Sequence, residues 1–119
     1  MNGDVLLSDT NFYLVKQNTP ILFEARIGDS QVGGTALRLN GTSIPMNPNG
    51  PTQIGKDGDD LRNSVLQCIT TVKDINQHTN NTSIEHQLTG GVSDEVFPYA
   101  IRVKKDKGIA RYFITYVLA

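Results

Sequence analysis

Apolar and polar side chains alternate along several short segments, most clearly near the carboxyl end. Within Ile109–Leu118 every even position is apolar or aromatic, and Phe97–Val103 repeats the pattern at its odd positions. This two-residue period is typical of a strand with one buried face, because successive side chains of a strand point to opposite faces. The turn Lys105–Gly108 separates the segments, so we expect a hairpin with Val103 opposite Ala110.

The same period recurs in the first half of the chain. Ile21–Ile27 has apolar residues at its odd positions, Ala36–Leu39 follows a glycine-rich stretch, and Phe12–Val15 is a further short strand. We expect Ile21–Ile27 and Ala36–Leu39 to form a second hairpin, with a kink or bulge at Gly33 and Gly34.

Residues 59–74 admit two interpretations. Leu61, Val65, Cys68 and Val72 fall at helical spacings, and an aspartate at position 59 or 60 could cap a short helix near residues 59–64. However, the β-branched residues concentrated between 65 and 72 lose rotamer freedom in a helix. We therefore favour a strand from residue 65 onward.

A polar turn leads from this strand to another alternating segment, Ile84–Leu88. If the two strands pair symmetrically about the turn, Thr70 lies opposite His86. Val72 then faces Ile84 and Cys68 faces Leu88.

These segments predict an all-β fold, a two-sheet antiparallel β-sandwich of seven or eight strands. It is immunoglobulin-like in architecture only, because the chain has no tryptophan and one cysteine, so the hallmark residues of that family are missing. With 119 residues, the chain is expected to form a single domain over 1–119.

Charge and cysteine content exclude several classes of protein. Eleven basic and twelve acidic residues give a formal net charge of −1, and the one basic cluster, Lys104, Lys105 and Lys107, falls in an expected turn. Nucleic acid is therefore not an expected partner. No apolar run of 18 residues is present, so we expect no membrane span. The amino terminus lacks the pattern of a signal peptide, which favours a cytoplasmic protein, although a trimmed exported protein would have the same sequence.

Residues 40–60 form a long segment rich in Pro, Gly and Asn, which we interpret as a crossover loop between the sheets. Rigid scaffolds often carry function on such loops. The loop residues that we expect to make contacts are Met46, Gln53, Asp57, Asp59 and Asp60.

Three of these residues, Asp57, Asp59 and Asp60, form the densest acidic cluster and are the candidate metal ligands. Calcium takes six to eight oxygen ligands, and carboxylates on a loop could supply several of them. The calcium-binding EF-hand pattern fails, because Leu61 stands where a third ligand is needed. A calcium site would need ligands from another loop, as in β-sandwiches that bind lipids or glycans, and we expect no cofactor here.

Cys68 and His86 are the candidate residues for a small thiol enzyme. The expected pairing makes them diagonal neighbours, but a thiol–imidazole pair also needs an orienting group and a cleft. His78 and His86 lack the spacing of a zinc site. Of the four tyrosines, only Tyr13 is expected to lie outside the core. One exposed tyrosine is not enough to form a surface on which a sugar could stack.

No catalytic set is visible in the sequence, so the expected function is that of a non-catalytic binding or assembly module that acts through its long polar loop. The alternatives are a calcium-dependent lipid- or glycan-binding module and, third, a Cys/His enzyme. The partner is an unknown protein or a second copy of the chain, which could pair through an exposed edge at Ile21–Ile27.

Overall fold

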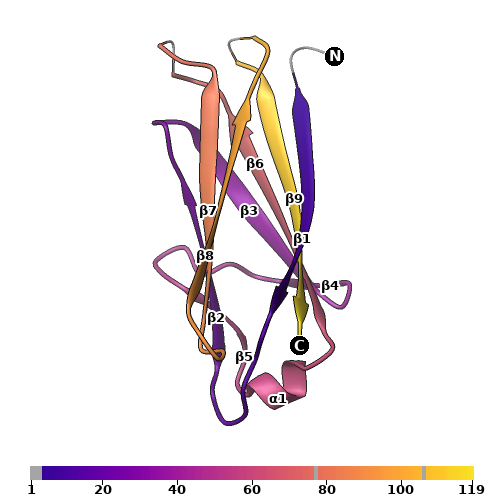
Figure 1. Ribbon diagram of the computed structural model, residues 1–119. Coiled ribbons are helices and arrows are strands. Elements are labelled where there is room, and N and C mark those ends of the chain that lie inside the picture. Colours follow the sequence, from indigo (N-terminus) through magenta and orange to yellow (C-terminus); the bar gives the residue numbers. More distant parts are fainter. Residues whose placement is uncertain (1–3, 77, 106) are drawn as a thin grey trace.

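The computed structural model describes residues 4–76, 78–105 and 107–119 as nine strands and one short helix in two packed sheets (Figure 1). The elements are β1 (Val5–Tyr13), β2 (Ile21–Ile27), β3 (Val32–Leu39), β4 (Thr42–Ile44), β5 (Thr52–Gly55), α1 (Gly58–Leu61), β6 (Val65–Lys73), β7 (Asn81–Thr89), β8 (Glu95–Arg102) and β9 (Ile109–Leu118). The molecule is elongated, 46 × 25 × 22 Å. The predicted all-β sandwich is confirmed, with more strands than expected.

The strand order is β1-β9-β6-β3-β4 in the five-stranded sheet and β5-β2-β7-β8 in the four-stranded sheet. Neighbouring strands are antiparallel, except that β1 runs parallel to β9. The first and last strands therefore lie side by side and point the same way, toward the end of the sandwich that carries α1 (Figure 1).

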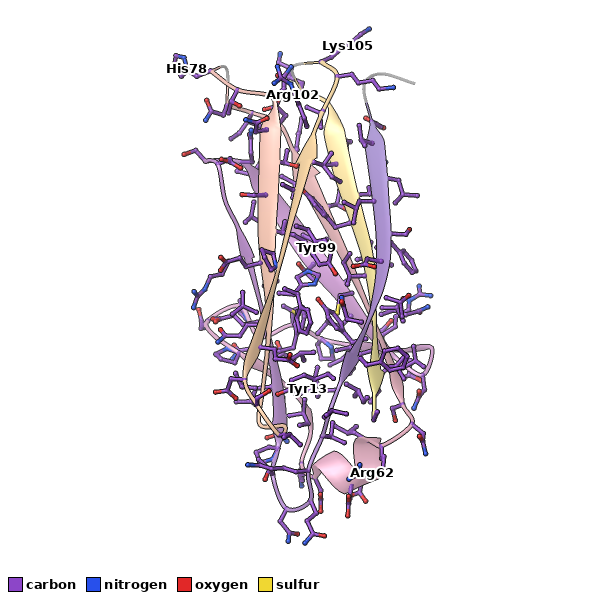
Figure 2. All side chains as sticks on the ribbon, viewed as in Figure 1. Tyr13, Arg62, His78, Tyr99, Arg102 and Lys105 are labelled. Atoms are coloured by element: carbon purple, nitrogen blue, oxygen red, sulfur yellow. The ribbon has the colours of Figure 1, made fainter. Side chains whose placement is uncertain are left out.

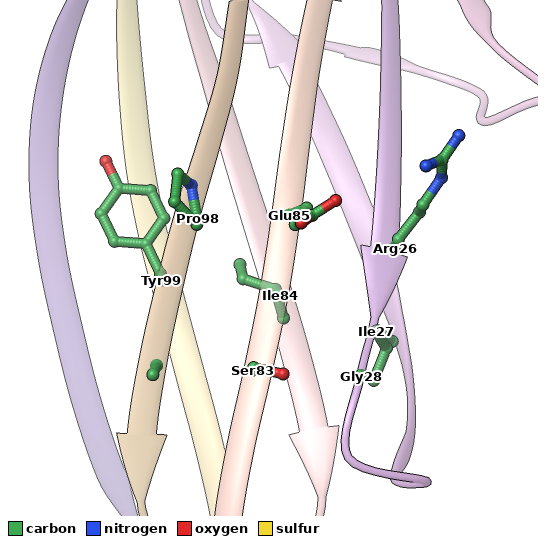
Figure 3. A pocket seen from close by; sticks show the side chains of 9 residues that line it. Arg26, Ile27, Gly28, Ser83, Ile84, Glu85, Pro98 and Tyr99 are labelled. Carbon is green, nitrogen blue, oxygen red and sulfur yellow. The ribbon is translucent and has the colours of Figure 1, made fainter.

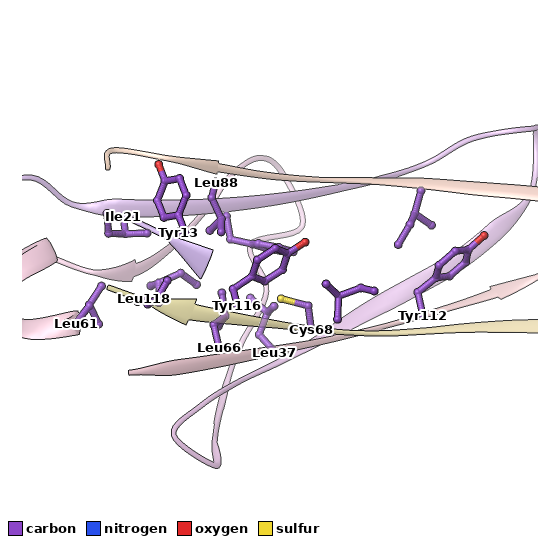
Figure 4. Close-up of a cluster of buried hydrophobic side chains, with 14 of the residues drawn as sticks. Tyr13, Ile21, Leu37, Leu61, Leu66, Cys68, Leu88, Tyr112, Tyr116 and Leu118 are labelled. Atoms are coloured by element: carbon purple, nitrogen blue, oxygen red, sulfur yellow. The ribbon is translucent and has the colours of Figure 1, made fainter. Parts of the chain in front are cut away.

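The core forms where the predicted apolar faces meet between the sheets (Figure 4). All five even positions of β9 are fully buried, and β6 buries alternate residues from Leu66 to Val72. Residues 65–73 are thus a strand, as favoured. The helix is confined to α1, and Asp57 caps it in place of the expected Asp59 or Asp60.

The three predicted hairpins are wrong, because each places in one sheet two strands that belong to different sheets. β8 and β9, β2 and β3, and β6 and β7 each face one another across the core. The alternation identifies the buried face of a strand correctly but carries no information about which strand lies beside it. Sheets pack about 10 Å apart, a gap that a connection of a few residues can span. Asp106, in the expected β8–β9 turn, and residues 1–3 lie outside the described residues.

Two consecutive strand pairs do form hairpins, β3–β4 and β7–β8. The first has a two-residue turn in which Asn40 and Gly41 both have positive φ, 50° and 84°, the geometry that Asn-Gly favours. The expected bulge at Gly33 and Gly34 is absent from β3, whose register with β6 is continuous. A Cβ at Gly33 would lie 2.0 Å from the Thr71 carbonyl oxygen, so glycine permits this close approach.

Residues 40–60 do cross from one sheet to the other, as expected, since β4 and β5 are edge strands of different sheets. The segment is more ordered than a loop, because it contains both of these strands and the start of α1. β2, expected to offer an exposed edge, pairs with β7 along most of its length and with β5 at its first three residues. No helix in the described part of the chain is long and apolar enough to cross a membrane.

Candidate functional site

The residues expected to make contacts in the crossover segment are largely engaged within the fold. Met46 packs against the core, and its sulfur lies 3.7 Å from the hydroxyl of buried Thr52. The Asp57 carboxylate accepts hydrogen bonds from the backbone N–H groups of Asn18 at 2.8 Å and Asp59 at 3.0 Å. Gln53 on β5 remains exposed.

The other two residues of the acidic cluster, Asp59 and Asp60, lie in the first turn of α1. Asp59 pairs with Arg62 at 2.6 Å across one turn, and Asp60 is exposed. In residues 4–76, 78–105 and 107–119, no group of three or more His, Cys, Asp or Glu side chains is placed to hold a metal ion. Asp57 is needed as the cap of α1, because the first N–H groups of a helix have no partner within it.

Cys68 and His86 are both fully buried, but the structure does not join them by a hydrogen bond. Burial raises the pKa of the Cys68 thiol, which disfavours the thiolate that a nucleophile requires. The two ring nitrogens of His86 are occupied by the Thr70 hydroxyl at 2.8 Å and the Tyr116 hydroxyl at 2.9 Å. His78 lies apart, at the end of the sandwich opposite α1 (Figure 2).

His86 is the centre of a polar chain that crosses the core. Thr35 on β3 hydrogen-bonds Thr70 on β6 at 2.9 Å, and Thr70 bonds His86, which in turn bonds Tyr116 on β9. Phe23 packs edge-on against the His86 ring at 5.1 Å. Burial lowers the pKa of His86 to about 4, so the ring is neutral at pH 7. These hydrogen bonds link the two sheets and give each of the four polar side chains a partner.

Tyr99 connects the two sheet edges formed by β1 and β8. Its hydroxyl donates to an Asp9 carboxylate oxygen at 2.8 Å and accepts from the Asn11 side-chain amide at 2.6 Å. Figure 2 places Tyr99 about halfway along the sandwich and Tyr13 closer to α1. Tyr13 is fully buried and donates to the Ser93 carbonyl oxygen, so our prediction that it lies outside the core is wrong.

A depression of about 410 Å³ lies on the outer face of the four-stranded sheet (Figure 3). Three small residues adjoin one another here, Gly28 just after β2, Ser83 on β7 and Ala100 on β8, and they lie beside a row of larger residues that contains Arg26 and Glu85. A site of this volume could hold a small molecule. It is open on its outer side, and Arg26 is 67% exposed and pairs with Glu24, so its polar groups do not converge on one point.

The outer face of the five-stranded sheet is markedly apolar at β1. Leu6 and Phe12 point away from the core and are 66% and 68% exposed. Phe12 adjoins Val117 on β9, which adjoins Val65 on β6, so one apolar row crosses three strands. On soluble proteins, exposed apolar patches often mark contact sites.

A second apolar row lies further along the same face, where Phe113 on β9 adjoins Ile69 on β6. Uncharged polar residues, including Thr10 and Thr115, separate the two rows. The charged residues whose side chains point outward from the described strands of this sheet are basic: Arg38, Lys73 and Arg111. We call the outward-facing residues Leu6, Ser8, Thr10 and Phe12 of β1, together with Val65, Ile69, Phe113 and Val117, the apolar face.

The apolar face was not found from the sequence, although its signal is present. In residues 5–13 the apolar residues Leu6 and Phe12 share a strand face, whereas Asp9 and Asn11 occupy the other. That pattern is ambiguous because both faces contain apolar residues, and only the part of the strand from Phe12 onward was predicted from it. Comparisons of the chain with protein-family models, curated proteins and solved structures found no match.

Proposed function

We propose that the protein is a non-catalytic binding or assembly module, and that its contact surface is the apolar face. The observation that carries this proposal is the exposure of Leu6 and Phe12 on a strand whose inward side holds Asp9 and Asn11. Burying two large apolar side chains stabilises a complex by about 1.5–3 kcal/mol for each. A partner that covers β1 would gain this energy without disturbing the fold.

The crossover segment supports the proposal less well as the contact region. Met46 and Asp57 are committed to the fold, and the exposed Gln53 and Asp60 are isolated polar residues. Single exposed polar side chains contribute little to affinity, because contact energy concentrates in buried aromatic and other large anchors. Phe12 is such an anchor.

Site-specific photo-cross-linking in the native cell tests this proposal. A photoreactive phenylalanine analogue replaces Phe12 in one variant, Gln53 in a second and Val96 in a third. Val96 is a matched control, because it is apolar and 50% exposed but lies on the outer face of the other sheet.

We expect a discrete cross-linked product from position 12, identifiable by mass spectrometry, and none from position 96. A product from position 53 alone would move the contact region back to the crossover. No product from any position would overturn the proposal that the protein acts by binding.

A further inference from the structure

The edges of the two sheets differ in how well they are protected from pairing with another strand. In the described part of the chain the edge strands are β1, β4, β5 and β8. β4 and β5 have three and four residues, and β8 contains Pro98, which lacks a backbone N–H, between the charged Glu95 and Arg102. Short length, proline and charge are the usual devices that protect an edge.

β1 has only one of these devices, the charge of Asp9. It is nine residues long, contains no proline and no basic residue, and has Asp9 as its one charged side chain. Its backbone pairs with β9 on one side, and no strand is hydrogen-bonded to it in the sheet on the other, where Tyr99 of β8 contacts Asp9 and Asn11 through their side chains. A row of unpaired N–H and C=O groups of this length is a template for another strand.

We infer that a second copy of this chain binds there, with the two β1 strands paired antiparallel about a two-fold axis at Asp9. This inference rests on the proposed function, since it names a partner for β1, the edge strand that carries Leu6 and Phe12 of the apolar face. A two-fold axis at Asp9 uses all nine residues of the edge. It joins the two five-stranded sheets into one continuous sheet, an arrangement in which the same patch serves both copies.

The pattern of β1 is self-complementary in this register. Leu6 lies opposite the partner's Phe12, and Phe12 lies opposite the partner's Leu6. The two most exposed apolar residues of the strand therefore form two cross-strand pairs in the dimer, one on each side of the axis. Ser8 lies opposite the partner's Thr10. Directly opposed apolar and hydroxyl pairs on one face of a sheet are favourable. The outward face of β1 has no charge to oppose this contact.

Asp9 is the unfavourable element of the pairing, because it lies opposite its own copy. Like charges directly opposed across a sheet are destabilising. The Tyr99 hydroxyl donates to the Asp9 carboxylate in each copy, which holds the side chain in place. Pairing along one strand also buries less than the roughly 1,600 Å² of a standard interface. We therefore expect a weak, reversible dimer whose affinity is lowered by the two opposed Asp9 carboxylates.

Sedimentation velocity over a range of protein concentrations tests the inference with three variants. The wild-type chain should shift from monomer to dimer as concentration rises, and Asp9→Asn should lower the dissociation constant several-fold. Thr10→Lys places a charge on the outward face of β1 and should abolish the dimer. Thr115→Lys is the matched control, because Thr115 adjoins Thr10 on the same face but one strand inward from the edge.

Disulfide cross-linking then checks the register. In an antiparallel pair, opposed Cα atoms lie about 4.5–5.5 Å apart, within the range of a disulfide. Asp9→Cys should therefore oxidise readily to a covalent dimer, and Thr115→Cys should not; native Cys68 is buried and does not interfere.

A chain that stays monomeric at all concentrations, with Asp9→Asn included, overturns the inference. Cross-linking at position 115 but not at position 9 also overturns it, because it indicates that two faces stack. A photo-cross-link from position 12 to a different protein, found together with a monomeric chain, would remove the second copy as partner and leave the proposed function standing.

Discussion

The Oγ1 atom of Thr70 on β6 lies 2.8 Å from Nε2 of His86 on β7, although the two residues belong to opposite sheets. From the sequence, these residues were expected to lie opposite one another as neighbours in a hairpin. They do meet, but through the core and not along a shared edge. This contact is the central link of the polar chain from Thr35 to Tyr116.

Thr70→Val should destabilise the fold, because valine has nearly the same shape but cannot bond Thr35 or His86. Leaving buried polar groups without a partner costs about 1–3 kcal/mol in the free energy of unfolding. Urea denaturation measures this. Thr71→Val is the matched control, since Thr71 is the next residue of β6 and points outward, and it should change the free energy by less than about 0.5 kcal/mol. Equal effects of both changes would show that the hydrogen bonds of Thr70 contribute nothing to the free energy of unfolding.

Stability should fall as the pH is lowered from about 6.5 to about 4. The pKa of His86 is lowered from 6.5 to about 4 in the fold by burial, so between these values the unfolded chain binds a proton that the folded chain does not. Stability decreases with falling pH wherever the unfolded state binds more protons, and the full difference amounts to about 3 kcal/mol. Above pH 6.5 this group should add no pH dependence.

Urea denaturation at pH 7.5, 5.5 and 4.5 provides the measurement for His86. His86→Gln should lose this part of the pH dependence even if it lowers stability overall. His78→Gln should retain it, because His78 is exposed. An unchanged slope in His86→Gln would contradict the assignment of this pH dependence to His86.

Gly90→Ala should be much more destabilising than Gly41→Ala, although both glycines have positive φ, 93° and 84°. A Cβ at Gly90 would lie 1.9 Å from the Pro20 carbonyl oxygen, whereas one at Gly41 would meet nothing within 4 Å. Positive φ alone costs about 1–2 kcal/mol. We expect Gly90→Ala to exceed this by about 2 kcal/mol or more, because backbone must move. Similar melting temperatures for the two variants would argue against the close approach of residues 20 and 90.

Asp57→Ala should lower the free energy of unfolding by about 0.5–2 kcal/mol, since it removes the cap of α1 and the partner of the Asn18 N–H. Asp60→Ala, in the same cluster, should have almost no effect. Thermal melts with and without millimolar calcium complete the test. We expect no calcium-dependent rise in the melting temperature of the wild-type chain; a rise that Asp59→Asn abolishes would restore the calcium-binding alternative.

The sequence correctly predicted which face of a strand is buried, but it was a poor guide to which strands lie side by side in a sheet. Alternation correctly identified the buried sides of β6, β7 and β9, because burial acts on each strand separately. Which strand lies beside which depends on how the turns direct the chain. At 28–31, for example, Asp29 and Ser30 both take positive φ and lead the chain from one sheet to the other, which their residue types do not require.

One signal was present and overlooked. Asn40-Gly41 is the dipeptide most typical of a two-residue hairpin turn, and it does join β3 to β4. By contrast, the place of β1 beside β9 could not have been predicted from the sequence, because this parallel pairing joins residues more than 100 positions apart. The apolar face depends on that pairing, since Phe12 adjoins Val117 only through it.

Our principal proposal is that β1 and the apolar face form the contact surface. Hydrogen exchange measured by mass spectrometry tests it most directly, by comparing the dilute chain with its assembled form, either the concentrated dimer or a complex recovered after photo-cross-linking. We expect the backbone amides of residues 5–13 to exchange markedly more slowly in the assembled form, and those of residues 95–102 to exchange at the same rate in both forms. Unchanged exchange in residues 5–13, with protection at residues 52–60 instead, would contradict it.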